Sequence, residues 1–337
     1  MTAVDLQPLS AEEYAVWRTL SRDGFVEQQV DARAMPRREA EEYADSLLAD
    51  LLPDGPASPG MHLWSLHRGG ERVGYLWLRI QQRSGGLSAY LMDVWVAPHV
   101  RRQGIARAAM LACESAAREM GAADIGLNVF GTNSAAIGLY ASMGYSVTVR
   151  QMVKCLDRAG SPDASAALPM PAEARVSLRA MTQERFDGFR TLQEMTYAAN
   201  IVRAGILPLP EARAKSADDM ARLLPDGRDT AGHALYSAFA VGVDPDHPNL
   251  EQEVGLVWLQ VSDRSDGRYA YGYRLEVRPE LRRHGYGHAI LFETERLLLA
   301  EKVRSVGLQV YDFNASARTL YEDAGFTVTS QQMKKRL

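Results

Sequence analysis

Two short runs of arginine and glycine have the composition of a phosphate-binding turn. They consist of Arg101, Arg102, Gln103, Gly104, Ile105 and Ala106, and of Arg282, Arg283, His284, Gly285, Tyr286 and Gly287. Glycine allows a ligand close to the backbone, arginine donates hydrogen bonds to phosphate oxygens, and the N-terminus of a following helix favours an anion. A tight strand-to-helix turn without a ligand would use the same residue types, so one isolated run is a weak motif.

The same neighbours follow both runs at a constant distance. An offset of 181 positions separates Asn133 from Asn314 and Tyr140 from Tyr321. A constant offset over several landmarks indicates duplication of one module. The sequence therefore predicts an N-terminal domain at residues 1–156, a linker rich in Ala, Pro and Ser at 157–175, and a C-terminal domain at 176–337.

The asparagine and tyrosine of each copy lie where helices are predicted, and each residue type has two roles open to it. A phenol can protonate a leaving group, so Tyr140 and Tyr321 are candidate catalytic acids, with packing in the core as the alternative. Asn133 and Asn314 precede these helices, where an N-cap role alone would explain an asparagine.

Asp93 and Glu276 are the acidic residues of the strands that lead into the two turns. A carboxylate there could act as a general base, or it could cap a strand end in solvent. The two residues are not equivalent, because the repeat offset aligns Asp93 with Arg274 and Glu276 with Trp95.

Hydrophobic periodicity and turn residues predict the same order of elements in both halves. In the first half we expect a strand at 4–6, helices from residue 10 and at 37–52, strands at 62–67, 73–80 and 89–96, a helix at 105–120, a strand at 124–130, a helix at 133–143, and a strand pair or long hairpin at 145–156. The second half should start with a strand at 176–178, helices at 182–203 and 209–224, and strands at 235–243, 254–261 and 269–277. It carries nine extra residues, most visibly around 242–253.

Composition excludes several classes of protein. The chain has 337 residues, 46% of them hydrophobic, and a formal net charge of −4, which does not indicate a nucleic-acid-binding module. Two cysteines are too few for a disulfide framework or a cysteine-based zinc site, and His284 and His288 lack an evident third ligand, so no metal is predicted. Without a leader or a long apolar run, we expect a cytoplasmic protein that does not bind a membrane.

Each half resembles the GNAT superfamily of acyl-CoA-dependent N-acyltransferases, most clearly over 91–154 and 272–335. The resemblance rests on the Arg-x-x-Gly-x-Ala and Arg-x-x-Gly-x-Gly turns and on the Asn and Leu-Tyr-x-x-x-Gly that follow them. It implies an α/β (α+β) fold of two tandem domains, each a mixed, mostly antiparallel twisted sheet with helices on both faces. Acyl-CoA should lie in a wedge between the strands at 89–96 and 124–130, and in the equivalent wedge of the second half.

The resemblance also assigns roles to individual residues. The turn should hold the pyrophosphate of coenzyme A, the Asn should lie near the cofactor, and the Tyr near the departing thiolate. The strand before each turn should pair with the pantetheine arm. These strand positions are Val94, Trp95 and Val96 in the first copy and Leu275, Glu276 and Val277 in the second.

The predicted function is N-acetyl transfer from acetyl-CoA to an amine, most readily that of a small molecule, with one cofactor for each domain. A binding protein in which one or both domains are catalytically silent is the first alternative. A transferase for protein lysine or N-terminal amines is the second. A monomer whose tandem domains imitate a dimer, or a homodimer, is expected.

Overall fold

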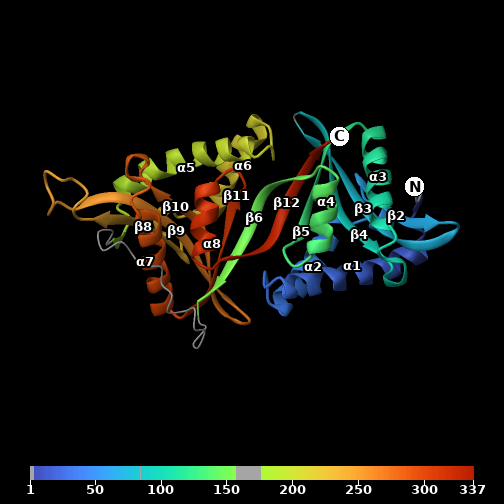
Figure 1. The fold of residues 1–337 in the computed structure, drawn as a ribbon, viewed down its shortest axis with the longest axis horizontal. Coiled ribbons are helices and arrows are strands. Elements are labelled where there is room, and N and C mark those ends of the chain that lie inside the picture. Colours follow the sequence, from blue (N-terminus) through green and yellow to red (C-terminus); the bar gives the residue numbers. More distant parts are fainter. Residues whose placement is uncertain (1–3, 84, 157–175) are drawn as a thin grey trace. The chain divides into compact units, whose positions relative to one another are not determined.

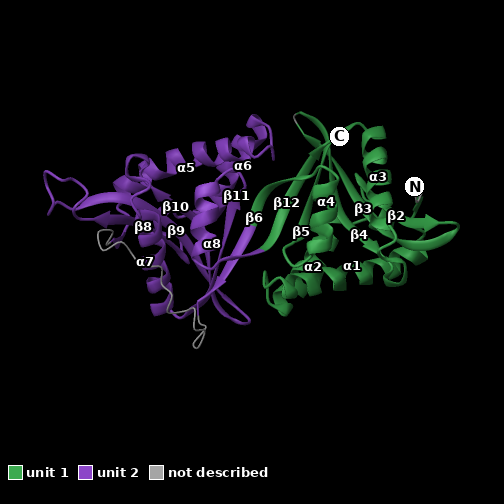
Figure 2. Cartoon of the chain, in the orientation of Figure 1, with its two compact units in different colours: residues 1–150, 329–337 green, residues 151–328 purple. Residues whose placement is uncertain are grey.

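The computed structural model describes residues 4–83, 85–156 and 176–337. They form two compact units, one of residues 1–150 with 329–337 and the other of residues 151–328 (Figure 2). The linker predicted at 157–175 lies outside the described residues. Each unit is a sheet with helices, as the sequence predicts, and Figure 1 labels the elements.

The first unit contains one mixed sheet and four α-helices. Its elements are β1 (Asp5–Pro8), α1 (Ala11–Asp31), α2 (Arg37–Leu51), β2 (Met61–Arg68), β3 (Glu71–Arg83), β4 (Gly86–Val96), α3 (Ile105–Glu119), β5 (Ala122–Phe130), α4 (Ser134–Ser142), the start of β6 (Ser146–Cys155) and most of β12 (Thr327–Arg336). The strand order is β1-β2-β3-β4-β5-β12-β6. Strands β4 and β5 are parallel, whereas β1–β2, β2–β3, β3–β4 and β5–β12 are antiparallel, which confirms the predicted mixed, mostly antiparallel sheet.

The second unit repeats this arrangement. Its elements are β7 (Ser177–Ala180), α5 (Gln183–Arg203), α6 (Leu209–Leu223), β8 (His233–Ala240), β9 (Gln252–Arg264), β10 (Gly267–Val277), α7 (Tyr286–Ala300), β11 (Val303–Tyr311) and α8 (Ala315–Asp323). Strand β6 ends beside β11, and the order continues β10-β9-β8-β7. The β8–β9 connection is longer than the β2–β3 connection, which places the extra residues of the second copy.

Successive residues of a strand face opposite sides of the sheet, and each side of the first unit has its own hydrophobic core. Leu76 packs in the core of the α3 residue Met110, while the next residue, Trp77, packs in the core of the α1 residue Trp17. Helices α3 and α4 therefore cover one face and α1 and α2 the other, as the residues of the two cores show (Figure 1).

The last strand of each repeat belongs to the sheet of the other repeat. In the first unit β12 pairs with β5, with Gln332 opposite Asn128. Lys335 of β12 contacts Glu114 of α3 at 2.7 Å, and the Glu114 side chain is 2% exposed. In the second unit, Lys154 of β6 contacts Glu295 of α7 at 2.6 Å. The compact units thus differ from the sequence repeats in the strands that complete each sheet.

The end of the first repeat corrects one sequence expectation. A strand pair or long hairpin was expected at 145–156, but the structure has the single strand β6 (Ser146–Cys155). Strands β12 and β11 supply its neighbours, so the chain does not have to fold back on itself there.

The parallel strands at the centre of each unit separate toward their C-terminal ends. Pairing of β4 with β5 ends at Leu91 and Leu127, although the strands continue to Val96 and Phe130. The equivalent pairing of β10 with β11 ends at Gly272 and Leu308. Both units therefore contain the predicted wedge. Among the described residues, no helix is long and apolar enough to cross a membrane.

Candidate active site

The turn between β4 and α3 has a backbone suited to an anion. Arg102 has φ +64° and Gly104, the residue before the helix, has φ +80°, so both adopt the left-handed conformation. No side chain caps the helix, and the N–H groups of a first helical turn lack intrahelical acceptors. Nε of Arg101 donates to the Val96 carbonyl at 2.9 Å, which fixes that guanidinium beside the turn.

The turn between β10 and α7 has the same form. Arg283 has φ +69° and Gly285 has φ +83°, and no side chain caps α7. Nε of Arg282 donates to the Val277 carbonyl at 3.3 Å. The two turns therefore share a left-handed residue before an uncapped helix, the backbone arrangement that suits an anion.

A cavity of about 960 Å³ in the first unit connects the turn with the wedge. It brings together nearly all the site residues predicted for the first copy, which are Asp93, Val94, Trp95, Val96, Arg101, Arg102, Gly104, Ile105, Ala106, Asn133 and Tyr140. Gln103 does not line it, and its amide oxygen accepts a hydrogen bond from Arg68 at 2.8 Å.

A β-bulge directs Asp93 into this cavity. Leu91 pairs with Leu78 and Asp93 pairs with Trp77, so Met92 is the extra residue that shifts the register. Oγ of Ser21 on α1 donates to Oδ2 of Asp93 at 2.9 Å. Burial raises the pKa of Asp93 to about 6, although the Ser21 hydroxyl and the Val94 N–H favour the ionised form and oppose the shift. A carboxylate with this pKa is suited to accept a proton near neutral pH.

Tyr140 lies in the same cavity, buried on α4. Burial is the main cause that raises the pKa of Tyr140, and the charge of the nearby Asp93 adds to it. Its hydroxyl therefore stays protonated at neutral pH and can donate a proton. In the second unit, burial raises the pKa of Tyr321 to about 12.

Asn133 and Asn314 both cap helices, which was one of the two roles open to them. Oδ1 of Asn133 accepts from the Ala136 N–H at 3.1 Å, and Oδ1 of Asn314 from the Ala317 N–H at 3.2 Å. Asn133 also lines the large cavity, so capping and a place at the site coexist there.

The wedge of the second unit has different chemistry. Arg274 occupies the place of Asp93, after a bulge at Tyr273. Nε of Arg274 donates to Oε2 of Glu276 at 2.8 Å, and Nη1 donates to Oε1 of Gln193 on α5 at 2.6 Å. Glu276, predicted as a base, is thus held in an ion pair with an arginine.

The helical residues that contact Asp93 and Arg274 also differ between the units. Helices α1 and α5 correspond at an offset of 172, which aligns Ser21 with Gln193. In the first unit the helix supplies a hydroxyl to a carboxylate, and in the second it supplies an amide oxygen to a guanidinium. Two contacting positions on separate elements therefore both differ between the repeats.

A smaller cavity of about 220 Å³ lies at the wedge of the second unit. Arg274 lines it, but the lining does not include the predicted residues Leu275, Glu276, Val277, Asn314, Tyr321 or those of the turn at 282–287. In the first unit one cavity brings the predicted residues together, whereas this smaller cavity of the second unit does not.

Sequence reasoning did not find several residues of the first cavity. They are Ser21, Phe25 and Tyr43 from α1 and α2, Phe130 from β5 and Gln332 from β12. The helical residues carry no motif, and Gln332 comes from the far end of the chain through the exchange of strands. A comparison of the two repeats at the level of contacts would have found Ser21, through its equivalence to Gln193.

The acetyltransferase (GNAT) family matches this chain at residues 26–145 and 222–326. The chain therefore belongs to the GNAT acetyltransferase family, with two such domains in tandem, and it is an acyltransferase. This confirms the fold and the family predicted from the sequence.

Three of the proteins similar to this chain are the following. The uncharacterized N-acetyltransferase YdgE of Bacillus subtilis (strain 168) is 30% identical over 155 residues, which are 46% of this chain and 99% of that protein. The uncharacterized N-acetyltransferase YycN of the same organism is 32% identical over 152 residues, 45% of this chain and 97% of that protein. A solved tandem GNAT protein from the clavulanic acid biosynthesis pathway is 20% identical, covering 99% of this chain and 98% of its own, with a TM-score of 0.42.

Proposed function

We propose that the protein transfers an acetyl group from acetyl-CoA to the amine of a small molecule, and that its first unit carries out the reaction. One observation carries the proposal: Asp93, Tyr140 and the phosphate-type turn line a single cavity. A base, an acid and an anion site are the three parts that acyl transfer to an amine requires.

The residues of the first unit fit acetyl-CoA. The left-handed Gly104 and the uncapped start of α3 suit a pyrophosphate, and Arg101, Arg102 and Arg107 supply charge at the same end of the cavity. The separated end of β4 offers backbone groups that no longer pair with β5, as a pantetheine arm would need. When bound, this cosubstrate supplies an activated thioester carbonyl.

Asp93 and Tyr140 divide the proton transfers between them. The Asp93 carboxylate takes a proton from the substrate ammonium, which leaves a neutral amine able to attack the thioester carbonyl. A nitrogen–carbon bond forms and the carbon–sulfur bond breaks. The Tyr140 hydroxyl donates its proton to the departing thiolate and recovers one from the acylated nitrogen. A backbone N–H of the separated part of β4 would stabilise the intermediate oxyanion.

The second unit is proposed to bind acyl-CoA without transferring the acyl group. Its turn has the backbone form of the first, but the place of the base is taken by Arg274, an acceptor-free guanidinium. In this proposal the first unit transfers the acyl group and the second unit only binds acyl-CoA. The cytoplasmic location and the acetyl group itself, in preference to longer acyl groups, remain predictions.

Substitution of the acid and the base tests which unit reacts. We expect Asp93→Asn and Tyr140→Phe to lower kcat by roughly 100-fold or more, as loss of a positioned proton donor or acceptor does. The measurement is free thiol released from acetyl-CoA in the presence of an amine.

The second unit provides matched controls for this experiment. Glu276→Gln and Tyr321→Phe should leave the rate within about twofold of the parent, since a surplus site makes no transition-state contact. Loss of turnover in the control variants, with Asp93→Asn still active, would assign the reaction to the second unit and refute the proposal.

A further inference from the structure

One part of the large cavity is lined by residues of α1, α2, β4 and β5. We call it the acceptor chamber and define it by the residues Leu20, Phe25, Tyr43, Leu47, Tyr90, Met92 and Phe130. We infer that the acceptor is an arylalkylamine, a primary amine that carries a flat apolar group. This inference rests on the proposed transferase function.

Three rings of the acceptor chamber lie close together, and a fourth lines the same cavity. The Phe25 ring lies 5.9 Å from Tyr43 and 6.1 Å from Phe130, between centroids. The Tyr90 ring lies across Gly126, where an added Cβ would approach to 3.2 Å, so the absence of a side chain there makes room for the ring. Rings from two helices and two strands thus surround one space, and aromatic groups pair favourably at such distances.

The charges of the cavity favour a single ammonium group. Among the described residues that line it, the charged ones are Arg22, Asp93, Arg101, Arg102 and Arg107. The last three gather at or near the turn. Asp93 is therefore the anionic partner available for the amine, and aromatic faces also attract a cation.

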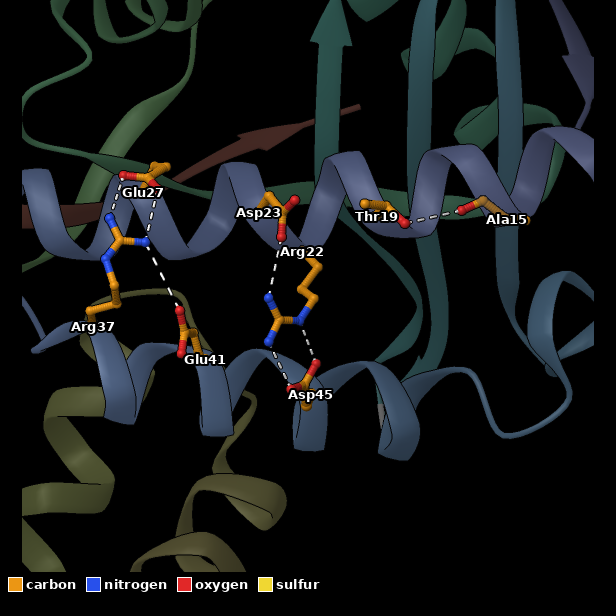
Figure 3. Close-up of polar contacts among 8 residues, drawn as sticks. All are labelled: Ala15, Thr19, Arg22, Asp23, Glu27, Arg37, Glu41 and Asp45. Carbon is orange, nitrogen blue, oxygen red and sulfur yellow. Dashed lines mark hydrogen bonds and ion pairs between the residues drawn. The ribbon is translucent and has the colours of Figure 1, made fainter.

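Apart from the three arginines at or near the turn, Arg22 is the one cation among the described residues that line the cavity, and Asp45 of α2 pairs with it. Its Nε and Nη2 donate to Asp45 at 2.6 and 2.9 Å, and Nη1 donates to Asp23 at 3.2 Å (Figure 3). Arg37 and Glu27 make a further link between the same helices. With Arg22 paired in this way, the acceptor chamber offers neither an unpaired cation for a carboxylate nor a row of acids for a polyamine.

The second unit shows that the fold does not impose an apolar chamber. At the equivalent positions of its smaller cavity, Phe25 is replaced by Tyr197, Leu47 by Asp219, Met92 by Tyr273 and Phe130 by Tyr311. The hydroxyl of Tyr197 donates to Asp219 at 3.1 Å. The same backbone positions thus hold a polar network in one unit and an apolar chamber in the other. The apolar character accompanies the unit that has the base.

A panel of amines tests the proposal. The probes are 2-phenylethylamine, hexylamine, spermidine, glucosamine and a basic peptide with a free N-terminus, each with acetyl-CoA and the full chain, and kcat/KM is measured by thiol release. We expect 2-phenylethylamine to exceed spermidine, glucosamine and the peptide by about tenfold or more, in the range that pocket complementarity provides.

Two substitutions connect this preference with the chamber. Phe25→Leu and Phe130→Leu should raise the KM for 2-phenylethylamine about fivefold, while the affinity for acetyl-CoA, measured by calorimetry, stays unchanged. Tyr197→Leu and Tyr311→Leu, at the equivalent positions of the second unit, should leave KM unchanged. Retention of both acetyl-CoA sites shows that the substituted unit is folded.

The outcomes separate the two proposals. Preferred turnover of hexylamine, spermidine or glucosamine, lost in Asp93→Asn, would leave the transferase function standing and overturn the arylalkylamine assignment. Preferred turnover of the peptide would overturn the small-molecule acceptor as well. A preference for 2-phenylethylamine that Phe25→Leu and Phe130→Leu do not affect would also overturn the role of the chamber. No turnover of any probe would contradict both proposals.

Discussion

A single pair of aligned residues, Asp93 and Arg274, distinguishes the two wedges most sharply. One is a carboxylate with a pKa of about 6 that accepts a bond from Ser21, and the other is a guanidinium paired with Glu276. At neutral pH a carboxylate of this kind takes up protons and an arginine does not. The two repeats thus share this position but differ in whether its side chain can accept a proton.

The raised pKa of Asp93 predicts the pH dependence of activity. Since the proposed reaction uses the ionised carboxylate of Asp93, kcat/KM should fall as the pH decreases through about 6, whereas an ordinary carboxyl group of pKa 3.8 would stay ionised to lower pH. The measurement is thiol release across pH 5 to 9 with a buffer of constant ionic strength.

Ser21 should control where that fall occurs. Its hydroxyl favours the ionised form of Asp93, so Ser21→Ala should raise the pKa further and move the acidic limb to higher pH. Gln193→Ala, at the equivalent position of the second unit, is the control and should not move it. An acidic limb that Ser21→Ala leaves in place would show that another group is the base.

At the scale of elements, the turn before each helix is set by its backbone. Gly104 and Gly285 both have positive φ, and both precede an uncapped helix. An added Cβ at Gly104 would meet no atom within 4 Å, so a side chain there would project into open space rather than into the core. A substitution at this residue should therefore weaken the binding of a pyrophosphate more than it destabilises the fold. The left-handed backbone would cost a non-glycine residue roughly 1–2 kcal/mol.

Glutamate at the two glycines should separate the two cofactor sites. Gly104→Glu places a negative charge beside the pyrophosphate, so we expect it to lose turnover and one of two acetyl-CoA sites in calorimetry. Gly285→Glu should lose the other site and keep turnover. Loss of turnover in Gly285→Glu, with normal activity in Gly104→Glu, would contradict the division between the units.

Most elements of the fold could be predicted from the sequence because their signals are local. Ser10 with Glu13 forms the capping box that opens α1, and the turns after Leu52 and Leu224 end equivalent helices. The pairing of the last strand of each repeat could not be predicted. Strands β6 and β12 occupy equivalent positions in the two repeats, and neither carries a local signal that decides whether it pairs with β5 or with β11. The acceptor chamber was missed for a related reason: Phe25 and Tyr43 are ordinary helical residues until α1 and α2 pack over the wedge.

At the scale of the whole molecule, the exchanged strands make each repeat contribute to the other's sheet. Strand β12 pairs with β5 along seven residue pairs, from Ser330 opposite Phe130 to Arg336 opposite Asp124. Lys335 then contacts Glu114, which is buried beneath it on α3. Helix α3, which starts at the phosphate-type turn, thus forms an ion pair with the last strand of the second repeat.

Removal of the Lys335 charge should destabilise the first unit. Lys335→Met leaves Glu114 buried without its closest cation, and we expect a loss of about 3 kcal/mol in the free energy of unfolding, measured by urea denaturation. The double variant Lys335→Met, Glu114→Leu should recover most of it. Lys154→Met is the matched change in the second unit and should leave turnover intact. An unaltered midpoint in Lys335→Met would refute a stabilising role for this pair.

The contribution of Gln332 to the cavity of the first unit has a consequence for synthesis of the protein. Residues 329–337 are synthesised after the second unit's residues 151–328, and they complete the unit whose other residues are made first. A premature stop after α8 would therefore yield a chain that contains the whole first repeat. Its first unit would still lack strand β12, which pairs with β5. The two repeats can thus differ in their site residues, as Asp93 and Arg274 do, while each sheet still contains a strand of the other repeat.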